Sequence, residues 1–152
     1  MNEGIKKLDG EIEPKGKDLK GYKNIASIKG IGPKSGTSLL SVIGDIGRFP
    51  SQKALDSYFG IVPRVRNSSD MIHYGRIPKQ GSKLGRTTLV QCTLVVIRYS
   101  PYLRKFYLRL KTKKGSGKAI IATSRKLLGI IYQTLKNDWI FEDFPNFVLK
   151  TE

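Results

Sequence analysis

The sequence predicts an all-α protein in which a helix-hairpin-helix is followed by an irregular basic loop and a three-helix bundle. Apolar residues recur at spacings of three and four in several separate segments, a pattern typical of amphipathic helices. Ser, Pro and Gly stand at the expected ends of these segments. The chain has 152 residues, of which 39% are hydrophobic. This fraction is enough for one packed core and argues against wholesale disorder.

The predicted organisation has three parts. Residues 1–24 form a polar tail or the remnant of a coiled-coil helix. Residues 25–137 form the main domain with the helix-hairpin-helix, and residues 138–152 form an aromatic C-terminal tail that packs back on the bundle. Every motif with a chemical interpretation lies in the main domain.

A Gly-Ile-Gly turn precedes the first long helix, which carries Leu39, Leu40 and Ile43 at helical spacing. Gly30 and Gly32 permit positive φ and close approach of a ligand to the backbone. The helix that starts there offers unpaired N–H groups and the positive end of its dipole, which together suit a phosphate. Lys29 and Lys34 flank this turn. The alternative is a tight turn between two core helices that needs glycine for its shape alone.

The next segments combine one short helix with a long irregular stretch. Ser51 is a good N-cap for a helix that runs to about Tyr58. From Gly60 to Lys79 the sequence is rich in Gly and Pro and reads as a loop. Brief strand pairing in this loop would use the residues Val62, Val65, Ile72 and Ile77.

Three helices complete the bundle. Ser82 caps a helix that ends near Tyr99, and Ser100-Pro101 supplies an N-cap followed by proline at the first position of the second helix. A loop over residues 113–117 separates this helix from the last one, whose apolar positions run from Ile120 to Leu135.

Positive charge dominates the composition and is unevenly placed. The chain has 28 Lys and Arg against 12 Asp and Glu, a formal charge of +16, and residues 71–137 hold 15 Lys or Arg and no acid. A long stretch of one sign suits a polyanion, because each neutralised phosphate releases condensed counterions. One alternative is an anionic membrane surface, which fits less well because the charges do not line one long amphipathic helix. The other is a basic pattern that serves solubility alone.

Several classes of protein are excluded or disfavoured. A single cysteine, Cys92, excludes an internal disulfide and a zinc site built on cysteines. No stretch approaches the roughly 20 apolar residues that cross a bilayer, and the N-terminus lacks the apolar region of a signal peptide. We therefore expect a cytoplasmic protein in a reducing environment.

A serine stands inside the basic loop. Arg64, Arg66, Arg76 and Lys79 surround Ser68, and guanidinium groups can stabilise the extra charge that develops when a hydroxyl attacks a phosphodiester. The alternative is a serine that caps a turn, as most loop serines do. The neighbouring acid and the chain's one histidine cannot build a metal site, so no metal ligand is expected.

Several landmarks occur in an order that resembles one family. The residues that carry the resemblance are Ser27 to Gly32, Leu39-Leu40, Ile43 to Ile46, Arg48-Phe49, Leu55, Tyr58, Gly60, Val62-Pro63, Ser68, Gly75 to Lys79, Gly81-Ser82, Arg86, Tyr99 to Pro101, Phe106-Tyr107 and Lys126 to Leu128. Over roughly residues 25–136 the chain is similar to the C-terminal domain of insertion-sequence transposases related to the Piv/MooV DNA invertases, recombinases guided by a bridge RNA.

The resemblance implies a function and a set of site residues. Members of this family join an N-terminal RuvC-like domain, which holds four acidic metal ligands, to a C-terminal domain whose serine bonds covalently to DNA. That serine corresponds to Ser68. The resemblance implies DNA as partner, guide RNA as a further one, and a homo-oligomer in the intact enzyme. Mg²⁺ is expected only with the acidic domain, and no cofactor is expected in this chain. The expected nucleic-acid-binding residues are Lys29, Gly30, Gly32, Lys34, Arg64, Arg66, Arg76, Lys79, Lys83 and Arg86.

The sequence also departs from the family's pattern. Ser69 stands where glycine is usual, Pro78 where Ser or Thr is usual, and Gly85 where leucine is usual, which weakens that helix start by about 1 kcal/mol. The acidic domain has no counterpart in this sequence. We therefore expect a truncated reading frame, an isolated domain or a decayed copy that binds DNA without cutting it. The alternative is a non-enzymatic helix-hairpin-helix module for branched DNA or structured RNA.

Overall fold

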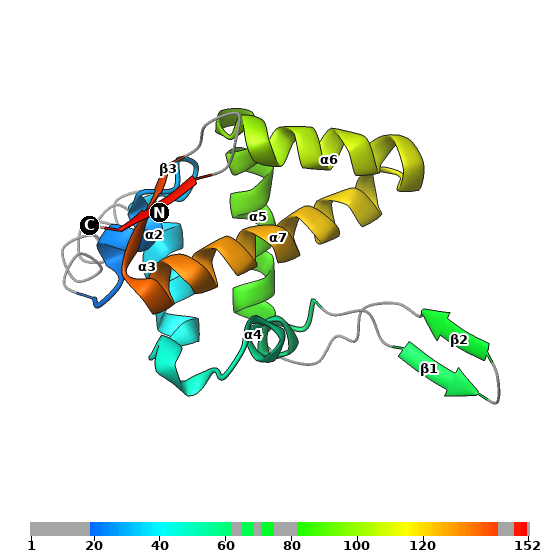
Figure 1. Cartoon of the computed structure of the whole chain (residues 1–152), viewed down its shortest axis with the longest axis horizontal. Helices are drawn as coiled ribbons and strands as arrows, with labels where there is room; N and C mark the ends of the chain where they lie inside the picture. Colours follow the sequence, from blue (N-terminus) through cyan, green and yellow to red (C-terminus); the bar gives the residue numbers. More distant parts are fainter. Residues whose placement is uncertain (1–18, 62–64, 69–70, 75–81, 143–147, 152) are drawn as a thin grey trace, which may run out of the picture.

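The computed structural model describes residues 19–61, 65–68, 71–74, 82–142 and 148–151. Over these residues the fold is all-α, as predicted, with two short antiparallel hairpins added (Figure 1). In chain order the elements are α2 (Tyr22–Ala26), α3 (Pro33–Ile43), the 3-10 helix η1 (Ile46–Arg48), α4 (Gln52–Phe59), β1 (Val65–Ser68), β2 (Met71–Tyr74), α5 (Lys83–Tyr99), α6 (Pro101–Lys114), α7 (Ser116–Asn137), β3 (Trp139–Glu142) and β4 (Val148–Thr151).

Helix α7 organises the core. It packs against α6 and α5 along its length, and also against α2, α4 and β3. The fully buried side chains come from every layer and form one cluster, which includes Ile25, Ile28, Leu39, Ile43, Leu55, Phe59, Leu89, Leu103, Leu127, Leu128 and Ile131. Burial of this continuous apolar cluster is the main force that holds the helices together.

The predicted helix starts are confirmed by their hydrogen bonds. The hydroxyl of Ser51 accepts a hydrogen bond from the amide of Ala54 at 3.2 Å, and that of Ser82 accepts one from the amide of Gly85 at 3.0 Å. Ser100 caps α6 in the same way at 3.1 Å, with proline in the first turn. Each cap satisfies an amide that the helix itself leaves without a partner.

The connection between α6 and α7 differs from the sequence prediction. The loop predicted over residues 113–117 is reduced to Gly115, which has a φ of 87° and joins α6 directly to α7. Lys and Ser are compatible with helix, so the flanking residues extend both helices, and only glycine takes the positive φ easily. Beyond α7 the chain forms β3, in which Phe141 is buried and its amide donates to the hydroxyl of Ser27 at 2.9 Å.

The segment predicted as an irregular loop contains a hairpin. Strands β1 and β2 pair Val65 with Tyr74 and Ser68 with Met71, so the brief pairing foreseen for Val65 and Ile72 is present. Val62 and Ile77 lie outside the described residues. The hairpin projects from the helical body on the same side as the α6–α7 turn (Figure 1).

Gly85, a residue expected to weaken the start of its helix, has a packing reason. A Cβ at this position would lie 2.9 Å from Cγ1 of Val42 and 3.0 Å from the Phe59 ring. The glycine is buried and lets the start of α5 approach both α3 and α4. The propensity lost in the helix is thus offset by a close contact between helices.

Candidate nucleic-acid interface

The two glycines of the turn between α2 and α3 have different surroundings. Gly30 has a φ of 109°, and a Cβ there would lie 2.8 Å from Cα of Val96 and 2.9 Å from its nitrogen. Gly30 is therefore needed for shape, because it lets the turn touch the backbone of α5. Gly32 has no atom within 4 Å of a Cβ and is the exposed N-cap residue of α3. Lys29 and Lys34 are exposed on either side, so the phosphate interpretation remains a prediction for Gly32.

The serine singled out by sequence is the last residue of β1. Its backbone pairs with Met71, while Arg66 pairs with His73. Residues two apart in a strand belong to the same face, so the register puts the backbone positions of Arg66, Ser68 and His73 on one face of the hairpin. The other basic residues assigned to this loop, Arg64, Arg76 and Lys79, lie outside the described residues.

The start of α5 holds the last two predicted contacts. Lys83 is exposed. Arg86 is half-buried, and its Nη1 atom is buried with no hydrogen-bond partner. These two residues therefore have different environments, one open to a nucleic acid and the other directed into the protein.

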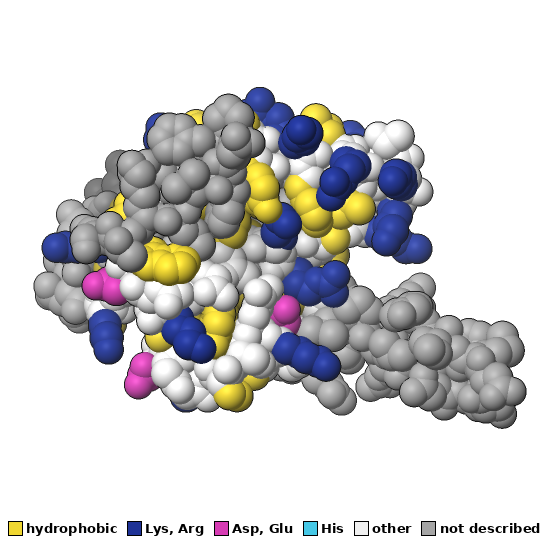
Figure 2. Space-filling view, viewed as in Figure 1, with side chains coloured by type: hydrophobic (Ala, Val, Ile, Leu, Met, Phe, Trp, Pro, Cys, Tyr) yellow, Lys and Arg dark blue, Asp and Glu magenta, His cyan; other side chains and the backbone are white. Residues whose placement is uncertain are grey.

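Among the residues that the structure describes, exposed positive charge is densest in a segment that the sequence analysis did not single out. It lies on α6 and the first turn of α7, residues 101–119, here called the basic arm. The arm has no acid, and its exposed cations are Arg104, Lys105, Arg109, Lys111, Lys113, Lys114 and Lys118. Figure 2 shows Lys and Arg side chains gathered at this end of the molecule. Six of these seven cations lie along α6, and the tight turn at Gly115 brings Lys118 of α7 close to the end of that helix.

Cation–π contacts stabilise the packing of α6 against α7. The ammonium of Lys126 on α7 lies 4.6 Å from the ring centre of Phe106 and 5.2 Å from that of Tyr102, both on α6. The guanidinium of Arg109 lies 5.5 Å from the Phe106 ring. Cations above ring faces are attracted by the ring's negative face. Arg104 also donates to the carbonyls of Ile97 and Arg98 at the end of α5, where a cation is favoured by the helix dipole.

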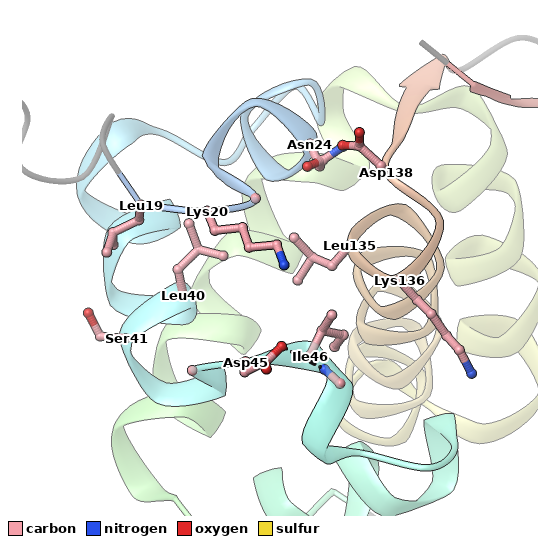
Figure 3. Close-up of a pocket in the computed structure, with 13 residues that line it drawn as sticks. Leu19, Lys20, Asn24, Leu40, Ser41, Asp45, Ile46, Leu135, Lys136 and Asp138 are labelled. Carbon is pink, nitrogen blue, oxygen red and sulfur yellow. Dashed lines mark hydrogen bonds between the residues drawn. The ribbon is translucent and has the colours of Figure 1, made fainter.

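Two of the described carboxylates lie away from the arm. Of the three described Asp side chains, Asp45 and Asp138 line a pocket of about 970 Å³ between α2, α3 and the end of α7 (Figure 3). The basic arm lies at the start of α7, and a helix of 22 residues is about 33 Å long. The two carboxylates therefore lie at the end of α7 and the basic arm at its start, and this separation favours approach of a polyanion to the start of α7.

The third carboxylate is buried. Asp56 of α4 is 7% exposed, and its Oδ1 atom has no hydrogen-bond partner. Burial raises the pKa of this carboxyl to about 6, while the positive charge of Arg125 on α7 acts in the opposite direction. Burial also raises the pKa of the Cys92 thiol, which is unsuited to reaction there.

Two further kinds of site were searched for. Within the described part of the chain, no three His, Cys, Asp or Glu side chains gather as a metal site would require. In the same residues, every helix is too short or too polar to cross a membrane.

Comparison with known proteins places this chain in a family. The family model described as "Transposase IS116/IS110/IS902 family" matches residues 22–108. A pilin gene-inverting protein of Moraxella lacunata is 39% identical over 122 residues, covering 78% of this chain and 38% of the relative. The IS1111A transposase of Coxiella burnetii is 25% identical over 138 residues, covering 88% of this chain and 38% of that protein. The chain thus spans less than half the length of these relatives, and it belongs to the IS116/IS110/IS902 transposase family.

Proposed function

We propose that this chain is the DNA-binding, serine-bearing domain of an insertion-sequence transposase, acting in DNA transposition or inversion. The observation that carries the proposal is the acid-free surface of α5, α6 and α7 in a member of a transposase family. The basic arm exposes seven cations and carries no acid, whereas a surface that served solubility alone would mix the two signs. A surface of one sign suits a polyanion, because each neutralised phosphate releases condensed counterions.

The DNA contact is tested by the salt dependence of affinity. Each phosphate neutralised on duplex DNA contributes about −0.9 to the slope of log K against log salt. Replacing Lys113 and Lys114 by Gln should therefore make the slope less steep by up to about 1.8. The loss of affinity between 50 and 200 mM salt should then be about 12-fold smaller in the variant than in the wild type. The matched control replaces Lys20 and Lys23, also exposed but near the pocket. Fluorescence anisotropy with a labelled duplex measures both variants, and an equal change in the two would contradict the assignment to the arm.

We further propose that Ser68 is the nucleophile of the intact enzyme. Its Oγ would form a new ester bond to a DNA phosphorus as the bond from phosphorus to one strand breaks. The serine proton leaves Oγ, and the released strand oxygen takes up a proton, so one phosphodiester replaces another. Arg64, Arg66, Arg76 and Lys79 would hold phosphates and offset the charge that develops.

Mg²⁺ would be held by the acidic domain, because the described Asp side chains do not converge. The metal would supply electrostatic stabilisation of the reacting phosphate. We expect the purified 152-residue chain to bind DNA without cutting it. Strand transfer by the chain alone would overturn this expectation.

The serine is tested by trapping protein–DNA adducts in the presence of a polypeptide that supplies the acidic domain. Ser68→Ala should abolish the adduct and change DNA affinity less than about twofold. Ser57→Ala, on the exposed side of α4, is the matched control and should leave the adduct intact. An adduct that persists in Ser68→Ala would remove the serine from the proposal.

Guide RNA and a second copy of the chain are the further partners that we propose. The same basic arm would contact either nucleic acid, so a structured RNA should compete with duplex DNA in the anisotropy assay. Light scattering on the complex would report the number of chains. An RNA that binds without displacing DNA would mean that a different surface holds it.

The second candidate is a non-enzymatic module that grips branched DNA or structured RNA through α2 and α3. The exposed end of α3, with Gly32 beside Lys29 and Lys34, favours it. In this case no adduct forms under any condition. Replacing Lys29 and Lys34 by Gln would then reduce affinity more than the Lys113 and Lys114 replacement does.

A further inference from the structure

Arg48, the last residue of η1, is held in one place by its neighbours. Its Nη2 atom donates to the carbonyl of Val42 in the last turn of α3 at 3.1 Å. Its Cζ atom lies 4.8 Å from the ring centres of both Phe49 and Tyr58. Gly44 leaves room on a further side, since a Cβ there would lie 3.9 Å from the Cζ and Nε atoms of Arg48. The guanidinium therefore has a fixed position before any ligand arrives.

The two rings that carry the guanidinium are themselves fixed to the core. The Phe49 side chain is 8% exposed, and the hydroxyl of Tyr132 on α7 donates to the Phe49 carbonyl at 3.4 Å. The ring centre of Tyr58 lies 5.4 Å from that of Phe49 and 6.3 Å from that of the fully buried Phe59. An arginine that rests on such rings loses little side-chain entropy when it binds, because its position is already set.

Arg48 is exposed all the same, and most of its donors are unused. A guanidinium presents a fork of N–H donors, and the contact with Val42 uses one of them. Within the part of the chain that the structure describes, no carboxylate forms an ion pair with Arg48. The nearest acid in the sequence, Asp45, accepts a hydrogen bond from the amide of Gly47 at 2.9 Å. The open edge of the guanidinium can therefore take an anion such as a phosphate, whose oxygens match two parallel N–H groups.

The first turn of α5 adds positive potential beside this site. The amide of Ser82, the N-cap residue of α5, donates to the carbonyl of Tyr58 at 2.9 Å. The N-terminus of a 17-residue helix, which is the positive end of its dipole, is thereby joined to the residue that supports Arg48. Lys83 at the first position of α5 is exposed, and α5 contains no acid. These surroundings favour an anionic ligand at Arg48.

We propose that Arg48 is a phosphate anchor that contacts the DNA backbone, with Tyr58 as the residue that positions its guanidinium. The inference rests on the proposed function, which supplies DNA as the ligand. The site is separate from the basic arm, because Phe49, beside Arg48, contacts Tyr132. Tyr132 lies about 24 Å along α7 from its first residue, Ser116, in the arm. Arg48 and the arm therefore hold different phosphates, and loss of one contact leaves the other in place.

The salt dependence of DNA affinity tests Arg48, because one lost phosphate contact makes the slope of log K against log salt less steep by about 0.9. Arg48→Gln should show this change, measured by fluorescence anisotropy with a labelled duplex. Arg48→Lys keeps the charge and should keep the slope, but should lower affinity at least about threefold, since an ammonium lacks the fork of the guanidinium. Lys23→Gln, which removes an exposed cation from α2, is the matched control and should leave slope and affinity unchanged.

A double-mutant cycle tests the positioning by Tyr58. Tyr58→Phe keeps the ring face and should bind DNA as the wild type does. Tyr58→Leu removes that face, so affinity should fall at least about threefold although no charge is lost. In the Arg48→Gln background the change to leucine should have no further effect, since the ring then has no guanidinium to hold. An effect of Tyr58→Leu that is equal in both backgrounds would remove Tyr58 from the proposal.

The outcomes separate the anchor from the proposed function. A wild-type chain without affinity for DNA would overturn the proposed function, and with it DNA as the ligand of Arg48. If the wild type binds and the Lys113 and Lys114 replacement changes its slope, an unchanged slope in Arg48→Gln would overturn the anchor alone. Urea unfolding reports whether each variant is folded. Should Arg48→Gln fail to fold, wild-type affinity in Arg48→Lys overturns the anchor in its place.

Discussion

Replacing Gly30 by alanine should destabilise the protein strongly, whereas the same change at Gly32 should not. At Gly30 the φ of 109° is strained for any residue with a Cβ, a cost of about 1–2 kcal/mol. The added methyl would also lie 2.8 Å from Cα of Val96, and this backbone atom cannot rotate away. Overpacking of this kind costs about 1–3 kcal/mol. The expected loss in the free energy of unfolding is therefore about 2–5 kcal/mol.

Gly32 is the matched control, since it lies two residues along the same turn. Its φ is −78°, and a Cβ there would meet open space. Alanine should change stability by less than about 1 kcal/mol, and the lower entropy of the unfolded chain could even favour the variant. Urea denaturation followed by circular dichroism at 222 nm measures both variants. A loss below 1 kcal/mol for Gly30→Ala would show that the turn does not need its close contact with α5.

The same pair of variants separates shape from ligand binding. If the turn holds a phosphate at Gly32, the methyl of Gly32→Ala should reduce DNA affinity in a protein of normal stability. Folded Gly30→Ala should bind DNA as the wild type does, because its site faces α5. Equal affinity of all three proteins would remove this turn from the DNA interface.

The remaining predictions concern single side chains. Asp56→Asn should gain stability relative to the wild type as pH rises from 4 to 7. The pKa of Asp56 is about 6 in the folded chain, above the ordinary 3.8, so the folded wild type binds more protons than the unfolded chain in this range and its free energy of unfolding falls by up to about 3 kcal/mol as pH rises. Urea unfolding at pH 4 and pH 7.5 measures the difference in stability between the two proteins. A difference that does not change with pH would contradict burial as the cause of the raised pKa. Ser82→Ala removes the cap of α5 and should cost about 1 kcal/mol in the same assay, with no loss expected for exposed Ser116→Ala. Lys126→Gln should cost about 0.5–2 kcal/mol through the lost contacts with the rings of Tyr102 and Phe106; thermal unfolding tests it, and an unchanged midpoint would mean that the cation does not fasten the arm.

Much of the helical architecture could be predicted because its causes are local. The caps at Ser51, Ser82 and Ser100 each act on an amide three residues along the chain. The helical spacing of apolar residues likewise repeats within a few residues, so both signals are readable before the fold is known. The boundary that failed, the loop over residues 113–117, contained residues that tolerate helix, and its length depended on how closely α6 and α7 pack.

The candidate site was only partly predictable. The charge asymmetry and the basic loop around Ser68 are properties of composition, and they pointed to nucleic acid. The basic arm was not recognised as a unit, because the loop predicted over residues 113–117 separated its cations, whereas α6 continues to Lys114 and α7 begins at Ser116. Arg86, expected at the surface, proved half-buried because the inward face of α5 starts beside it.

The sequence by itself determined the helical class, the three serine caps and the excess of positive charge, since each of these depends on neighbours along the chain or on composition. Only the tertiary structure decided that Gly30 serves packing, because Val96 is distant in sequence and close in space. It also buried Asp56 with its Oδ1 atom lacking a hydrogen-bond partner, and placed Asp45 and Asp138 at the end of α7 away from the basic arm. Burial and electrostatic environment arise from contacts between distant segments, and no local pattern specifies them.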